Sequence, residues 1–148
     1  MRKILLPPIL LILCLFGMIA LDRFGNPNVF MEGSATSIGY FIGLIGIGLP
    51  IWGAQIFKQR ETNILPYLDP DKIVTEGPFK FSRNPMYLGM LLVLLGGTIK
   101  LGILEGFLFT GLFFAVANWW YIPFEEEKMK AAFGTAFDDY CTQVRRWI

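Results

Sequence analysis

Two short stretches of the sequence contain the residues that could do chemistry. The first, SRNPMY at residues 82–87, places an arginine, an asparagine and a tyrosine at the start of an apolar run. The second, FEEEKMK at residues 124–130, places three glutamates directly after another apolar run. The chain has no histidine, which excludes a histidine general base, a Ser-His-Asp triad and the common histidine-ligated metal sites. The two cysteines, Cys14 and Cys141, are far apart, so no CxxC metal site is expected.

Each stretch also has an explanation that involves no reaction. Asn84 is a good N-cap and Pro85 a good first helical residue, so the pair is typical of a helix start. Arg83 can extend to lipid headgroups. Glutamates after Pro123 suit the positive end of a helix dipole. However, an anionic inner membrane surface attracts basic rather than acidic residues, so a carboxylate there also fits a cationic ligand. Locally, both interpretations stay open.

The elements that must position these stretches are membrane helices. The chain is 54% hydrophobic with a mean hydropathy of +0.52, above the range of soluble domains. Apolar runs at residues 4–21, 38–57, 86–101 and 104–122 predict about four helices crossing a hydrocarbon core of roughly 30 Å. The expected fold is therefore all-α, a polytopic membrane helical bundle that forms one domain over residues 1–148.

The distribution of basic residues predicts the orientation of this bundle. With the N-terminus in the cytoplasm, eleven lysines and arginines fall inside and only Arg23 and Lys100 outside, a strong positive-inside bias. We therefore expect a multi-pass protein with both termini cytoplasmic, in a bacterial inner membrane or its equivalent. The segment after residue 124 predicts amphipathic helices on the same side. The net charge of +1 gives no indication of a nucleic-acid partner.

The two stretches belong to longer motifs with a recognisable order. EGPFKFSRNPMYLG, a helical hairpin and IPFEEEKMKAAFGTAFDDYCTQVRRWI follow one another over residues 76–148. This arrangement resembles the isoprenylcysteine carboxyl methyltransferase-like family of integral membrane methyltransferases. The family pattern is G-P-aromatic-x-aromatic-x-R-H-P-x-Y-x-G, followed by E-E-x-x-x-x-x-x-F-G-x-x-aromatic-x-x-Y-x-x-x-V-x-R-W.

The resemblance implies methyl transfer from S-adenosylmethionine at the cytoplasmic face, with residues 76–148 as the cofactor-binding half. It implies no metal. Glu125, the first of the paired glutamates, is the expected catalytic residue. The residues expected to bind the cofactor are Arg83, Asn84, Tyr87, Leu88, Glu125 and Glu126.

The physical chemistry of these residues suits a sulfonium nucleoside. Carboxylates can hold its amine or its ribose, and aromatic faces attract a cationic methyl group by roughly 0.5–2 kcal/mol. A helix N-terminus offers N–H groups to a carboxylate or a ring nitrogen. Methyl transfer is an in-line displacement that depends on positioning. A carboxylate or thiolate acceptor needs no general base, so the absence of histidine is compatible with the chemistry.

Two departures from the family pattern leave the methyl acceptor open. Asn84 stands where the family usually has histidine, and Tyr121 stands where the prenylcysteine enzymes have an arginine one turn before the paired glutamates. A prenylcysteine carboxylate, a lipid headgroup, an amine, a thiol or another small lipophile are all candidates.

A non-catalytic membrane binding or assembly protein that keeps the fold is the alternative function. A small transporter is less favoured, since no ionisable residue is expected near the bilayer midplane. The oligomeric state is open, because the glycine faces could pack within one chain or between chains.

Overall fold

The computed structural model describes residues 6–61 and 72–148, and its regular structure is helical throughout these ranges. The all-α prediction is confirmed. An isolated bridge joins Val29 to Ile103, and no strand forms among the described residues. The elements are α1 (Pro7–Phe24), η1 (Gly33–Ser37), α2 (Ile38–Gln59), η2 (Gly77–Lys80), α3 (Pro85–Leu101), α4 (Gly106–Val116), η3 (Ala117–Tyr121), α5 (Ile122–Phe133) and α6 (Thr135–Gln143).

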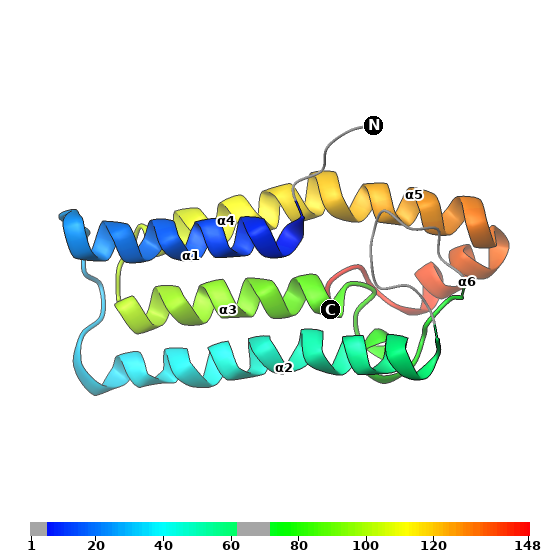
Figure 1. The fold of residues 1–148 in the computed structure, drawn as a ribbon, viewed down its shortest axis with the longest axis horizontal. Helices are drawn as coiled ribbons and strands as arrows, with labels where there is room; N and C mark the ends of the chain where they lie inside the picture. The colour runs from blue at the N-terminus through cyan, green and yellow to red at the C-terminus, as the bar shows by residue number, and fades with distance from the viewer. Residues whose placement is uncertain (1–5, 62–71) are drawn as a thin grey trace.

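The helices α1 to α4 lie side by side along the long axis of the molecule, with α3 between α1 and α2 (Figure 1). The α5 helix continues α4 beyond one end of the bundle, and α6 folds back beneath it (Figure 1). At this end, which we call the α6 end, α1 and α3 begin and α2 terminates. The opposite end holds the connection from α1 to α2 and the turn from α3 to α4.

The closest helix packing joins α2 to α3 through glycines. A Cβ atom added at Gly46 would lie 2.6 Å from the Val93 nitrogen and 2.7 Å from the Gly89 oxygen. A Cβ atom at Gly96 would lie 2.6 Å from the Gly39 oxygen. The two backbones therefore touch, as small residues permit in membrane helices. On the other side of α3, the core includes Cys14, Met18, Leu94, Phe113 and Ile122.

The helix bounds differ in detail from the predicted spans. The first helix runs over Pro7–Phe24 rather than residues 4–21, and residues 4 and 5 lie outside the described ranges. Within the described residues, Pro7–Phe24, Gly33–Gln59 and Gly106–Phe133 are long and apolar enough to cross a membrane, and Pro85–Leu101 is a shorter apolar helix. Three to four membrane helices agree with the predicted number.

One prediction about the acidic stretch is wrong. Pro123 does not begin a new helix, because Tyr121 and Ile122 already have helical dihedrals and the chain is helical from Gly106 to Phe133. The π-helical η3 ends two residues before Pro123, and there the Ile122 N–H donates to the Ala117 carbonyl, five residues earlier, so the helix continues into the proline. Glu125, Glu126 and Glu127 therefore lie inside a long helix, and the dipole of a helix N-terminus does not explain them.

Candidate functional site

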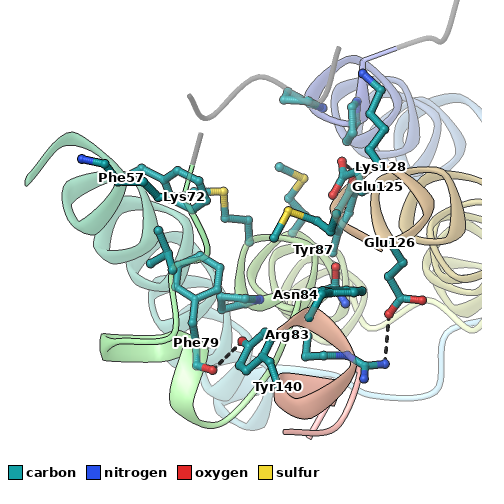
Figure 2. A pocket seen from close by; sticks show the side chains of 18 of the residues that line it. Phe57, Lys72, Phe79, Arg83, Asn84, Tyr87, Glu125, Glu126, Lys128 and Tyr140 are labelled. Atoms are coloured by element: carbon teal, nitrogen blue, oxygen red, sulfur yellow. Dashed lines mark hydrogen bonds and ion pairs between the residues drawn. The ribbon is translucent and has the colours of Figure 1, made fainter. Parts of the chain in front are cut away.

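A pocket of about 310 Å³ opens at the α6 end of the bundle (Figure 2). Its walls come from the start of α1, the end of α2, the segment before α3, the first turns of α3, and α5 and α6. Most lining side chains are apolar, and the charged ones are Lys72, Arg83, Glu125, Glu126 and Lys128. An apolar cavity with a few polar groups is the usual form of a small-molecule site, and ligand pockets span roughly 300–1,000 Å³.

Tyr87 and Glu125 meet across this pocket. The Tyr87 hydroxyl donates a hydrogen bond of 2.5 Å to a carboxylate oxygen of Glu125. Tyr87 lies in the first turn of α3 and is only 6% exposed, while Glu125 lies on α5. The residues are 38 positions apart in the sequence. The start of α3 and the acidic part of α5 thus form one site.

Glu126 has different partners from Glu125. Its carboxylate accepts a 2.9 Å hydrogen bond from Arg83 and a 2.5 Å hydrogen bond from Arg146. The second amino group of the Arg83 guanidinium donates to the Cys141 carbonyl at 3.2 Å. The remaining donor, Nε of Arg83, is buried and has no partner among the described residues. A buried donor of this kind is costly unless a bound group accepts from it.

Asn84 occupies the N-cap position of α3, but its side chain does not cap the helix. Its amide nitrogen donates instead to the Arg146 carbonyl at 3.0 Å, and its backbone N–H donates to the Ser82 hydroxyl. The predicted capping role of the side chain is therefore wrong, because the amide is oriented toward the Arg146 carbonyl and its oxygen does not accept from the helix N–H groups. Asn84 lines the pocket, whereas Leu88, on the next turn of α3, is not among its lining residues.

Tyr121, at the position of the family arginine, does not face the pocket. Its ring lies against the Tyr87 ring, with centroids 6.1 Å apart and planes at 18°, and it is 5% exposed. It therefore supports Tyr87 from behind, and the pocket has no cation at this position.

The predicted site residues did not include Tyr140, which lines the pocket from α6. The Tyr140 hydroxyl donates to the Phe79 carbonyl at 2.7 Å (Figure 2), and burial raises the pKa of Tyr140 to about 12. Tyr140 thus stays a hydrogen-bond donor at neutral pH. Outside the pocket, Arg146 binds the Glu126 carboxylate and Trp147 binds the Asn118 side chain. The terminal R-W pair of the second motif marked their positions but did not indicate their partners.

The fold and the pocket define a helical membrane protein with a candidate ligand pocket at one end of its bundle. A family model described as phospholipid methyltransferase matches residues 35–136. The chain belongs to this family of membrane methyltransferases, which confirms the family predicted from the two motifs. It is also 38% identical over 63 residues to an uncharacterized protein of Haemophilus influenzae, a match that covers 43% of this chain and all of that protein.

Proposed function

We propose that the protein is an integral membrane methyltransferase that transfers a methyl group from S-adenosylmethionine to a lipophilic or small acceptor. The observation that carries the proposal is the contact between Tyr87 and Glu125 in a pocket of a chain from a methyltransferase family. The two motifs are distant in the sequence, yet both contribute side chains to the same cavity.

The residues of the pocket fit the cofactor. Glu125 is a carboxylate at the pocket wall, suited to the amine or the ribose hydroxyls of S-adenosylmethionine. The unpartnered Nε of Arg83 can donate to the cofactor carboxylate. Phe57, Phe79 and Tyr87 add aromatic surface to the lining. When bound, the cofactor supplies an electrophilic methyl group on a sulfonium sulfur.

The protein's own contribution is to orient the reactants and exclude water. The Tyr87 hydroxyl fixes the rotation of the Glu125 carboxylate, and Tyr121 fixes the ring of Tyr87. Holding two reactants in line can supply roughly 7–11 kcal/mol of the barrier. We assign Glu125 as the catalytic residue, because its carboxylate faces the pocket and can also accept a proton from the acceptor.

The pocket favours a neutral nucleophile over a carboxylate as the acceptor. Tyr121 replaces the arginine that would hold a carboxylate and does not line the cavity. The two amino groups of the Arg83 guanidinium already bind Glu126 and the Cys141 carbonyl, and the remaining Nε is assigned above to the cofactor carboxylate. The acidic Glu125 would repel an anionic acceptor. A lipid headgroup amine or a thiol agrees with these features and, for the headgroup, with the family description.

We place the pocket at the cytoplasmic face, with both termini cytoplasmic. Among the described basic residues, nine lie at the α6 end, whereas Arg23 and Lys100 lie at the opposite end (Figure 1). This distribution follows the positive-inside rule.

Calorimetry with S-adenosylhomocysteine tests the proposal on folded, detergent-solubilised full-length protein. The wild-type chain is expected to bind and Glu125→Ala to lose binding. Glu127→Ala is the matched control, because Glu127 is an exposed glutamate that does not line the pocket. No binding by the wild-type protein would refute the proposal. Binding without transfer to any lipid, thiol or prenyl acceptor would favour a non-catalytic binding protein.

A further inference from the structure

The residues after α6 form a short irregular tail, residues 144–148, that contacts the segment leading into α3. The Arg145 carbonyl accepts a 3.0 Å hydrogen bond from the Arg83 N–H. The Arg146 carbonyl accepts from the Ser82 hydroxyl at 3.3 Å and from the Asn84 amide at 3.0 Å. Two adjacent carbonyls of the tail therefore hold the three residues that lead into α3.

The side chain of Arg146 ties the same tail to α5. Its guanidinium donates to both oxygens of Glu126, at 3.3 Å and 2.5 Å. Arg83 binds the same carboxylate at 2.9 Å. The side-chain exposures are 34% for Arg146, 20% for Glu126 and 14% for Arg83, so the cluster is partly shielded from water. Screening is weaker there than at the surface.

Trp147 anchors the far end of the tail. Its indole N–H donates to the Asn118 side chain in η3 at 3.0 Å, and its ring lies 5.1 Å from that of Phe114 in α4. The tail therefore bridges the start of α3 and the long helix formed by α4, η3 and α5. These are the two elements that carry Tyr87 and Glu125.

We propose that Arg146 is a positioning residue, which sets the separation of the two halves of the pocket through Glu126 and Asn84. It does not line the cavity itself. The inference rests on the proposed function, because the separation that it sets is that of the cofactor-binding groups. The matched family segment ends at residue 136, before this tail.

The test compares Arg146→Ala with Arg145→Ala in full-length protein, using S-adenosylhomocysteine as the probe. Arg145 is exposed and contributes its carbonyl, which the alanine variant retains. Arg146→Ala is expected to weaken the affinity by about tenfold or more, the scale on which small displacements in a site are felt. Arg145→Ala should stay within about twofold of wild type. Arg146→Lys, which keeps the charge but loses the forked geometry, should be intermediate.

Affinity is measured well below the unfolding temperature of each variant, so that all of the protein is folded. If Arg146 had a purely structural role, its substitution would lower the unfolding temperature but leave the affinity unchanged. If Arg146→Ala does not fold, Arg146→Lys decides. Wild-type affinity in the folded Arg146 variants would overturn the inference while the proposed function stands. Failure of the wild-type protein to bind would instead refute the proposed function.

Discussion

At the scale of single residues, the Tyr87 hydroxyl is the most direct test of the site. Tyr87→Phe removes the 2.5 Å hydrogen bond to Glu125 but keeps the ring that stacks on Tyr121. This bond to a charged group contributes about 1.5–3 kcal/mol to holding the Glu125 carboxylate at the pocket wall, so its loss should lower the affinity for S-adenosylhomocysteine by roughly tenfold. Calorimetry measures the change.

Tyr40→Phe is the control for this substitution, since Tyr40 is an exposed tyrosine at the other end of the bundle. It should bind the nucleoside as the wild-type protein does. An unchanged affinity in Tyr87→Phe would show that Glu125 does not need the hydroxyl to hold the ligand.

The family motifs predicted several residues that line the pocket, but not the partners of those residues. Tyr87 and Glu125 were predicted from the resemblance to the family motifs, and both line the pocket. Glu126 was expected to bind cofactor, yet the structure places Arg83 and Arg146 on its carboxylate. Local spacing could not show this, because Arg146 is 20 residues away and reaches Glu126 only after α6 folds back. Nor could it show that the Arg146 carbonyl would compete for the Asn84 amide.

At the scale of elements, the packing of α2 on α3 depends on the absence of side chains at the contact. A Cβ atom at Gly89 would lie 2.5 Å from the Gly46 oxygen and would also clash with the Pro50 ring. Gly89→Ala should therefore destabilise the protein by about 1–3 kcal/mol, the usual cost of overpacking. Unfolding by denaturant in detergent measures this loss.

Gly43→Ala on the same pair of helices is the matched control. A Cβ atom there meets nothing within 4 Å, so the change should be neutral or should stabilise the helix by up to about 1 kcal/mol. Equal stability of the two alanine variants would contradict the observed approach of the helices.

The end opposite the pocket contains a pH-sensitive connection between elements. The Asn28 backbone N–H donates to both oxygens of Glu105 at 3.0 Å, and the Asn28 amide donates at 2.6 Å. These hydrogen bonds hold the pKa of Glu105 below its usual value, and the bond from the Asn28 backbone has the largest effect. The stabilisation is therefore complete above the ordinary glutamate pKa of about 4.3 and is lost as the pH falls through the lowered value.

Glu105→Gln should consequently lower the thermal unfolding midpoint at neutral pH, with the difference from wild type closing in acid. Scans at a series of pH values measure it. Glu32→Gln, at an exposed glutamate of the α1–α2 segment that also contains Asn28, should show no such convergence. A constant offset for Glu105→Gln at every pH would indicate that its charge does not matter.

Elements were easier to predict than their junctions. Long apolar runs are visible in the sequence, so the four helices appear close to the predicted positions. The continuity from α4 through α5 was not visible, because Pro123 ordinarily marks a boundary. A π-helical turn just before a proline depends on how the neighbouring helix packs, and local propensity does not encode it.

At the scale of the whole molecule, composition specified the environment more firmly than the chemistry. Hydropathy and charge predicted a membrane bundle, and the described helices agree with it. They said nothing of the acceptor, since a pocket wall of phenylalanine and methionine admits many lipophiles. The choice of acceptor depends instead on a few polar positions. One of them is Tyr121, which stands in place of a cationic residue and packs against Tyr87.

The orientation of the bundle yields a prediction about the whole molecule. In a background with Cys14→Ala and Cys141→Ser, a single cysteine replaces either Ser34 in η1 or Ala132 in α5, both exposed and at opposite ends (Figure 1). Because the basic residues concentrate at the α6 end, that end should face the cytoplasm. A membrane-impermeant maleimide should then label Ser34→Cys in intact cells and Ala132→Cys only after permeabilisation. The reverse pattern would place the pocket on the outer face, where S-adenosylmethionine made in the cytoplasm could not reach Glu125 directly.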